Sequence, residues 1–182
     1  MIHKIALWQK IGFFFTIGFG VLLHFLYEWS NESIWIAPFS GVNESTWEHM
    51  KLLFFPMFLF AVVQSFFFKY YKNFWTIKLK GILLGLLLIP LLFYFYNGVI
   101  GKSPDWVNIL IFMISTGCTY IYETKNFNKK DTVEKESNSS FVLVLFIGVM
   151  FVLFTFKPLD LSIFQDPNTG SYGIDNFVSF II

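Results

Sequence analysis

The chain has 182 residues, of which 55% are hydrophobic and only 14% are charged, against about 25% charged residues in soluble proteins. A water-soluble domain of this length could not bury so much apolar surface. The net charge of +1 and the absence of arginine argue against a nucleic-acid-binding protein and against a dedicated phosphate clamp, since arginine is the usual bidentate ligand of phosphate.

Five apolar segments approach the length of about 20 residues that crosses a bilayer. They cover residues 5–27, 52–68, 79–96, 106–122 and 141–156. The first segment is too long for the core of a signal peptide, and no A-x-A-like cleavage site follows it, so we interpret it as an uncleaved helix. We therefore expect an all-α fold, a polytopic integral membrane helix bundle in which residues 1–182 form a single membrane domain.

The lysines predict the orientation of this bundle. Ten of the 13 lysines fall at the N-terminus or in the second and fourth loops, and only Lys51, Lys102 and Lys157 fall on the other side. Since positive charge accumulates in cytoplasmic loops, we expect a cytoplasmic N-terminus and, with five spans, an outer tail over 158–182. The apolar end of that tail, 177–182, is too short to cross, and it either lies in the interface or re-enters the bundle.

The fourth loop, residues 123–140, is rich in Lys, Asp, Glu, Asn and Ser. This composition is typical of a mobile solvated segment, and the lysine pattern places the loop in the cytoplasm. We expect Glu123 to reach the cytoplasmic interface near Lys125.

The densest polar cluster, residues 42–49, precedes the second apolar segment. Ser45 followed by Glu48 matches a capping box that begins a helix, and Lys51 lies where it could pair with Glu48. The same spacing puts Glu44 and Glu48 within about 40° of each other on a helix face. Glu48 is therefore either a capping residue or a functional carboxylate.

A candidate metal site combines this cluster with the outer end of the first segment. His24 and Glu28 are spaced i,i+4 and can share one helix face. An ionisable residue about one turn inside a membrane boundary suggests a function, although a neutral His24 bonded to a neighbouring group is the alternative. His24, Glu28, Glu44 and His49 supply nitrogen and carboxylate ligands that zinc, iron or manganese accept. No ligand spacing of a known metal motif is matched, and Glu44, Glu48 and His49 are the catalytic candidates.

The tail contains a strong turn signal, Asp-Pro-Asn-Thr-Gly, within residues 165–173. This stretch is either a lid over the outer mouth of the bundle or a plain surface turn. The candidates for a lid or pocket are Asn43, Trp47, Lys51, Asp166 and Tyr172.

Three strings carry a resemblance to a known family. His24–Trp29 (HFLYEW), Val42–Leu52 (VNESTWEHMKL) and Asp166–Gly173 (DPNTGSYG) resemble a family of small polytopic membrane proteins from Gram-positive bacteria that has no assigned activity. The resemblance implies a multi-pass protein of the bacterial cell membrane, and it implies no chemistry.

Three functions remain open, because the sequence holds no nucleophile elbow, P-loop, dinucleotide fingerprint or haem motif. The first is a metal-dependent hydrolase or transferase at the outer leaflet, with metal-activated water as nucleophile and Glu48 as general base. The second is a small-solute or cation transporter or channel subunit, and the third is a non-catalytic interaction protein. The expected partners are the lipid bilayer and a small-molecule or lipid ligand at the outer face. Few ionisable residues fall within 79–96 and 106–122, which disfavours a proton-driven pump.

Overall fold

The fold is described by a computed structural model, which covers residues 2–128 and 138–174. Its helices are α1 (Ile2–Trp29), α2 (Thr46–Phe67), α3 (Phe74–Val99), α4 (Asp105–Phe127) and α5 (Asn138–Phe156). The described residues contain no strand, and their one isolated β-bridge joins Gln165 to Tyr172. The described part of the chain is therefore all-helical, as the sequence predicts.

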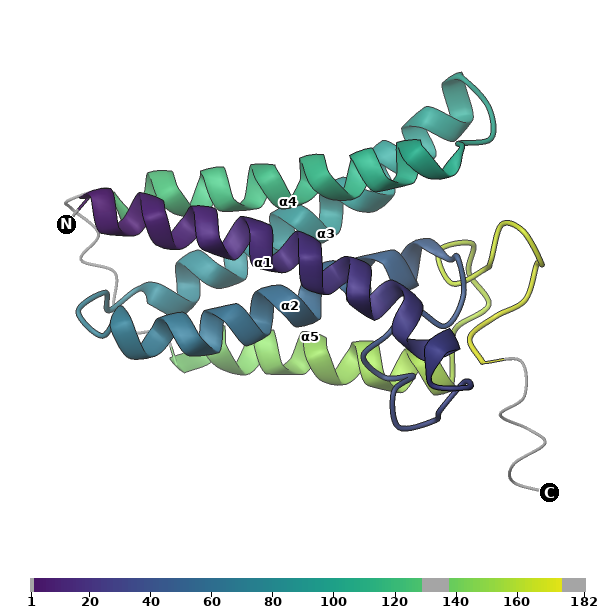
Figure 1. Cartoon of the computed structure of the whole chain (residues 1–182), viewed down its shortest axis with the longest axis horizontal. Coiled ribbons are helices and arrows are strands. Elements are labelled where there is room, and N and C mark those ends of the chain that lie inside the picture. The colour runs from purple at the N-terminus through teal and green to yellow at the C-terminus, as the bar shows by residue number, and fades with distance from the viewer. Residues whose placement is uncertain (1, 129–137, 175–182) are drawn as a thin grey trace.

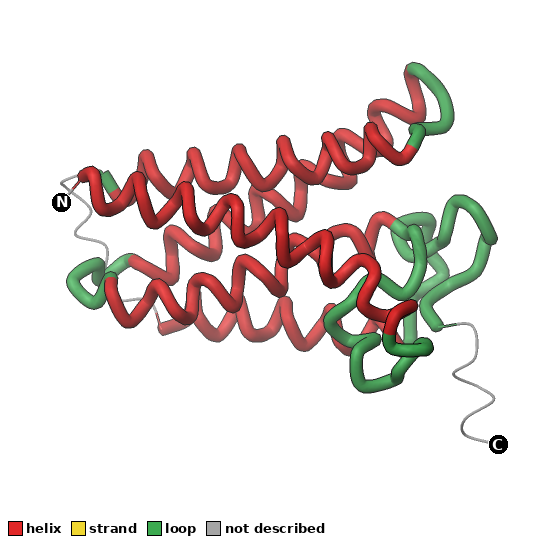
Figure 2. The backbone as a smooth tube through the Cα atoms, viewed as in Figure 1, coloured by secondary structure: helices red, strands yellow, loops and turns green. Residues whose placement is uncertain are grey.

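The five helices run along the long axis of the molecule and alternate in direction (Figure 1). The loops 30–45 and 100–104 lie at the same end as the tail 157–174, and the loop 68–73 lies at the opposite end together with the N-terminus (Figure 2). Because successive helices reverse direction, segments far apart in the sequence meet at one end of the bundle. We call the end that holds the two loops and the tail the outer end.

Four of the helices are long and apolar enough to cross a membrane. Their qualifying segments are Lys4–Trp29, Thr46–Phe67, Phe74–Val99 and Asn138–Phe156. These segments make the chain a multi-pass membrane protein, in which the sides of the helix bundle contact lipid.

Helix α4 falls short of the composition of a span, although it runs beside α1 for much of its length (Figure 1). Its polar side chains face inward, since Ser115, Thr119 and Glu123 are fully buried. Its exposed surface is apolar and includes Ile109 and Ile121. The mean hydropathy of α4 does not reveal that its polar and apolar residues lie on different faces. This arrangement suits a helix that packs in a bundle and turns an apolar face to lipid.

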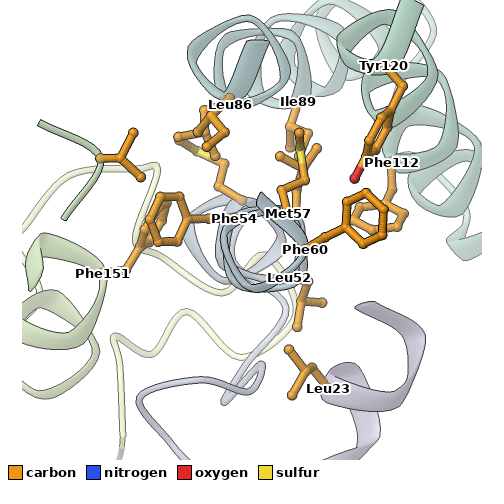
Figure 3. Close-up of a cluster of buried hydrophobic side chains, with 14 of the residues drawn as sticks. Leu23, Leu52, Phe54, Met57, Phe60, Leu86, Ile89, Phe112, Tyr120 and Phe151 are labelled. Carbon is orange, nitrogen blue, oxygen red and sulfur yellow. The ribbon is translucent and has the colours of Figure 1, made fainter. Parts of the chain in front are cut away.

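Helix α2 lies at the centre of the bundle, and the side chains of the other helices point toward it (Figure 3). Its residues Leu53, Phe54 and Met57 are almost fully buried, and they pack in one cluster with Ile82 of α3 and Phe151 of α5. This central position explains why α2 has the largest buried share among the four apolar segments.

The helices are longer than the apolar segments that predict them. Helix α2 begins at Thr46 rather than at residue 52, because the Ser45 side chain caps it by accepting a hydrogen bond from Glu48 N. Helix α4 continues to Phe127, so the predicted mobile loop 123–140 begins inside a helix. Residues 129–137 of that loop and the apolar end of the tail, 177–182, lie outside the described residues.

The expected position of Glu123 is wrong. Its carboxylate is fully buried and pairs with Lys78 of α3, with Nζ and Oε2 2.6 Å apart. A carboxylate this deep in a bundle needs a partner charge, and α3 supplies one that sequence spacing does not reveal.

Candidate functional site

A pocket of about 420 Å³ opens at the outer end, between α1 and α4. Its walls come from α1, α2, α4, the loop 30–45 and the tail. The lining residues are Gly20, Val21, His24, Phe25, Glu44, His49, Leu52, Asp105, Asn108, Ile109, Phe112 and Asn168. The polar members gather at the outer end, and the wall that continues toward the lipid is apolar.

Three of the predicted residues meet in this pocket. His24 Nε2 lies 3.6 Å from Glu44 Oε1, and His49 Nε2 lies 3.5 Å from Glu44 Oε2. The two imidazole rings have centroids 5.8 Å apart. We call His24, Glu44 and His49 the His–Glu–His triad. Their side chains are 30%, 43% and 21% exposed, so a ligand can reach the triad from the protein surface.

The orientation of His49 is set by its own helix. Its Nδ1 lies 2.9 Å from the carbonyl oxygen of Ser45. A carbonyl can only accept, so Nδ1 carries the proton. In the neutral imidazole, Nε2 therefore presents a lone pair to Glu44.

Glu44 is held by the start of α2 and by the tail. It directly precedes the helix cap Ser45, and its backbone N–H donates to Asp166 Oδ2 over 3.2 Å. The other carboxylate oxygen of Asp166 accepts from the backbone N–H groups of Asn168 and Thr169. The turn predicted from the sequence thus braces the backbone of Glu44, and Asp166 itself is buried.

The other residues predicted for a lid do not line the pocket. Asn43 donates from Nδ2 to the carbonyl of Gly173. Trp47 packs against Phe151 of α5 with ring centroids 4.6 Å apart. Tyr172 forms the isolated bridge to Gln165. These residues join the tail to α2 and α5, while Asn168 is the tail residue that lines the pocket.

Glu48 and Lys51 also lie away from the pocket. They form a buried ion pair in which Nζ and Oε2 are 2.5 Å apart. Glu48 accepts from Val42 N, and Lys51 donates to the carbonyl of Ala37 and to Thr155 Oγ1. This pair fastens the outer loop and α5 to α2, and it keeps the Glu48 carboxylate occupied.

Glu28 lies one turn beyond His24 at the exposed end of α1, and its charge acts on the His24 imidazole. It is not among the residues that line the pocket. Within residues 2–128 and 138–174, no three His, Cys, Asp or Glu side chains are grouped closely enough to hold a metal ion as they stand. The two imidazoles of the triad face different oxygens of the Glu44 carboxylate, which separates their nitrogens.

Asp105, Asn108 and Asn168 also line the pocket, and none of them was predicted from the sequence. Asp105 and Asn108 are spaced i,i+3 at the start of α4, so they share a face. This spacing at the start of an apolar segment could have identified the two residues as site candidates. They are predicted to lie on the same side of the membrane as the acids of the first outer loop. Nothing in the sequence distinguishes Asn168 as a pocket residue, since it lies in a turn with several other polar residues.

No curated protein and no solved structure matches the chain significantly. Residues 1–174 match the family described as "Family of unknown function (DUF6512)". This match includes the triad, the pocket and the described part of the tail. The chain therefore belongs to the DUF6512 family, a family whose function is not known.

Proposed function

We propose that the protein is a metal-dependent, membrane-embedded hydrolase or transferase that acts on an amphipathic substrate at the extracytoplasmic face of a bacterial cell membrane. The observation that supports this proposal is the convergence of His24 and His49 on the Glu44 carboxylate, inside a pocket with an apolar wall.

The separations within the triad favour a shared cation. At 3.5 and 3.6 Å, the nitrogen–oxygen pairs are longer than ordinary hydrogen bonds of about 2.7–3.2 Å. Two ligand atoms on a tetrahedral zinc ion, each about 2.0–2.2 Å from the metal, lie about 3.3–3.6 Å apart. A rotation of Glu44 about its terminal torsion, which is soft, would bring one oxygen between the two imidazoles. Zinc fits this ligand set, and iron or manganese accepts the same ligands.

The remaining pocket residues suggest the roles of a hydrolytic site. A bound metal would supply an activated water molecule as nucleophile. Asp105 is the carboxylate we assign as general base, because Glu48 is held in its ion pair with Lys51. Asn108 can donate a hydrogen bond to an oxygen of the substrate. Val21 and Ile109 form the apolar wall along which an acyl chain would lie.

The metal content of the purified protein tests this proposal. We expect about one equivalent of zinc, iron or manganese per chain, and at least about tenfold less in His24→Ala and in His49→Ala. Only the neutral imidazole binds metal, so acidification should release it. Glu32→Gln, which changes an exposed acid of the same outer loop, is the matched control and should keep the metal. Equal metal content in all four proteins, or none in the wild type after metal addition, would refute the metal site.

Catalysis needs a separate assay. The metal-loaded protein is incubated with vesicles of bacterial phospholipid, and the products are analysed by mass spectrometry. We expect a released headgroup or a lysolipid with the wild type and neither with His49→Ala. A metal-loaded protein that releases no product from phospholipid or from other lipid substrates of the outer leaflet would contradict the enzymatic part alone.

A second candidate, a small-solute or cation transporter, is favoured by the two ion pairs buried in the bundle, Glu48–Lys51 and Lys78–Glu123. Charges inside a membrane bundle commonly mark a transport path. This candidate predicts that a solute raises the melting temperature of metal-free protein, whereas the enzyme predicts that stabilisation depends on metal.

A further inference from the structure

We infer that Lys78 and Glu123 form the inner station of a proton path that follows the interface of α1 and α4 to the outer pocket. The inference does not depend on the metal site, because none of the residues that carry it belongs to the His–Glu–His triad. It rests on an incompletely bonded ion pair, a buried pair of hydroxyl groups and the apolar plug between them and the pocket.

The ion pair lies in an aromatic enclosure near the inner ends of α3 and α4. Lys78 Nζ is 5.6 Å from the ring centroid of Tyr120, and 6.0, 5.8 and 5.9 Å from those of Phe60, Phe74 and Phe127. Such contacts attract the ammonium group to the rings. The enclosure keeps a charged pair in a place where bulk water cannot screen it.

One oxygen of the ion pair is left without a hydrogen bond of ordinary geometry, since Lys78 donates to Glu123 Oε2 and not to Oε1. Among the described residues, Glu123 Oε1 and both side-chain atoms of Gln64 have no hydrogen-bond partner of ordinary geometry. The Gln9 amide faces the Glu123 carboxylate only as a weak donor, outside that geometry. All three side chains are at most 2% exposed. An unpaired buried polar group destabilises the folded state, and water molecules that bridge such groups remove this cost.

Gly81 of α3 packs directly against the Glu123 carboxylate. A Cβ atom on Gly81 of α3 would lie 2.8 Å from Glu123 Oε1, so only a glycine leaves room there for the unpaired oxygen. Gln64 lies on α2 between Phe60 and Phe68, one turn from each. Phe60 approaches Lys78, and Phe68 contacts Phe127. Helical periodicity therefore turns Gln64 toward the same enclosure.

A pair of hydroxyl groups continues the track toward the outer end. Tyr120 lies three residues from Glu123 on α4, and the charge of Glu123 acts on it. Its hydroxyl is hydrogen-bonded to Thr16 Oγ1 of α1 over 2.8 Å. Thr16 is fully buried and Tyr120 is 4% exposed. Hydroxyl groups both donate and accept, so this pair can pass a proton by reorienting.

Phe112 of α4 packs against α1 one turn outward from Thr16. Gly20 follows Thr16 by one turn of α1, and a Cβ atom on Gly20 would lie 2.7 Å from Phe112 Cζ. Gly20 and Phe112 both line the pocket. Phe112 thus fills the notch at Gly20 and closes the track at its outer end, as a hydrophobic gate does.

The proton balance is simple. The Glu123 carboxylate takes a proton from water at the inner end and becomes the acid, while Lys78 keeps its charge. The acid then releases the proton through bridging water to the Tyr120–Thr16 hydroxyl pair and on to water in the outer pocket. Each group returns to its starting state, and the membrane potential sets the direction. The groups that face the pair are Gln9 of α1, Gln64 of α2 and Tyr120 of α4.

Proton flux into proteoliposomes tests the path. The full chain is reconstituted with a pH-sensitive dye inside the vesicles, and a potassium gradient with valinomycin sets the potential. We expect the wild type to acidify the lumen faster than empty vesicles, and Phe112→Ala to conduct faster still. Tyr120→Phe keeps the ring and removes only the hydroxyl, so it should reduce the flux at least about tenfold, as should Glu123→Gln.

Tyr122→Phe is the matched control, because it removes a hydroxyl from the same helix outside the track. It should conduct as the wild type does. If Glu123→Gln fails to fold, the flux through Tyr120→Phe decides the test. The melting temperature of Tyr120→Phe shows whether that variant is folded. No flux in either the wild type or Phe112→Ala would overturn the inference, and so would equal flux in Tyr120→Phe and Tyr122→Phe. The metal measurement on the histidine variants is independent of both outcomes.

Discussion

Glu48 takes neither of the two roles that its place in the sequence allows, a helix cap or a carboxylate of the pocket. Ser45 caps α2, as the capping-box pattern predicts, but Glu48 does not complete the box. Its carboxylate turns to Lys51 and Val42 instead. A buried charge is costly unless it is paired and hydrogen-bonded, and the i,i+3 spacing supplies the pair within one helix.

At this scale we predict that Lys51→Met lowers the free energy of unfolding by about 3–5 kcal/mol, because Glu48 is left charged and buried without a partner. Unfolding of the detergent-solubilised protein measures the effect. The double variant Lys51→Met, Glu48→Leu should recover part of the loss. Lys102→Met, which changes an exposed lysine of another outer loop, should stay within about 0.5 kcal/mol of the wild type. A loss of similar size in Lys102→Met would show that the effect is not due to burial.

The contact between α3 and α4 is the best example of an interaction between elements. Gly81 and Gly85 lie four residues apart on α3, and both face α4. A Cβ atom on Gly85 would lie 2.7 Å from Thr119 Oγ1 and 3.1 Å from Leu53 Cδ1. Small residues at this spacing let membrane helices approach closely. Thr119 then bonds across the interface to the carbonyl of Gly81.

We therefore predict that Gly85→Leu separates α3 from α4 and destabilises the bundle by about 1–3 kcal/mol or more. Thermal unfolding in detergent measures this effect. Gly98→Leu is the matched control on the same helix, because nothing lies within 4 Å of a Cβ atom there. If the two variants melt at the same temperature, close approach at Gly85 does not hold the two helices together.

Two of the three glycines of α1 serve the same kind of packing, whereas nothing lies within 4 Å of a Cβ atom at Gly18. Gly12 faces Phe60 and Tyr120, and Gly20 faces Phe112. Aromatic side chains of the same chain therefore pack against both glycines.

At the scale of the whole molecule, the alternation of five helices places both outer loops and the tail on one side (Figure 1). The structure changes the lysine count that predicts the orientation. Lys78 and Lys51 are buried in ion pairs, so nine lysines on the inner side remain against two on the outer side. The bias toward a cytoplasmic N-terminus is therefore stronger than the plain count of ten against three.

Cysteine labelling in intact cells tests this orientation. After Cys118→Ser removes the single native thiol, we expect Trp35→Cys to react with a membrane-impermeant maleimide. We expect Tyr70→Cys to react only after the membrane is permeabilised. Both positions are strongly exposed, at 84% and 94%, so access to the reagent depends on the side of the membrane. The reverse pattern would place the triad in the cytoplasm.

Local sequence predicted much of the candidate site but not its partners. His24 was identifiable because ionisable groups are rare in apolar segments, and Glu44 and His49 because they belong to the densest polar cluster, residues 42–49. Glu48 was assigned to the same group, since helix periodicity alone puts it near Glu44. The choice between pocket and core depended on Lys51, Thr155 and Ala37, which come from three different elements. Periodicity contains no information about neighbours from other elements.

The sequence by itself determined the fold class and the approximate positions of the helices, because hydropathy acts on each segment independently of its neighbours. The tertiary structure alone decided that His24 and His49 face one carboxylate, that Asp166 supports the backbone of Glu44, and that Lys78 meets Glu123. Each of these contacts joins residues from different helices or loops. Their distances depend on how the bundle packs, and close packing follows the shapes of all five helices together.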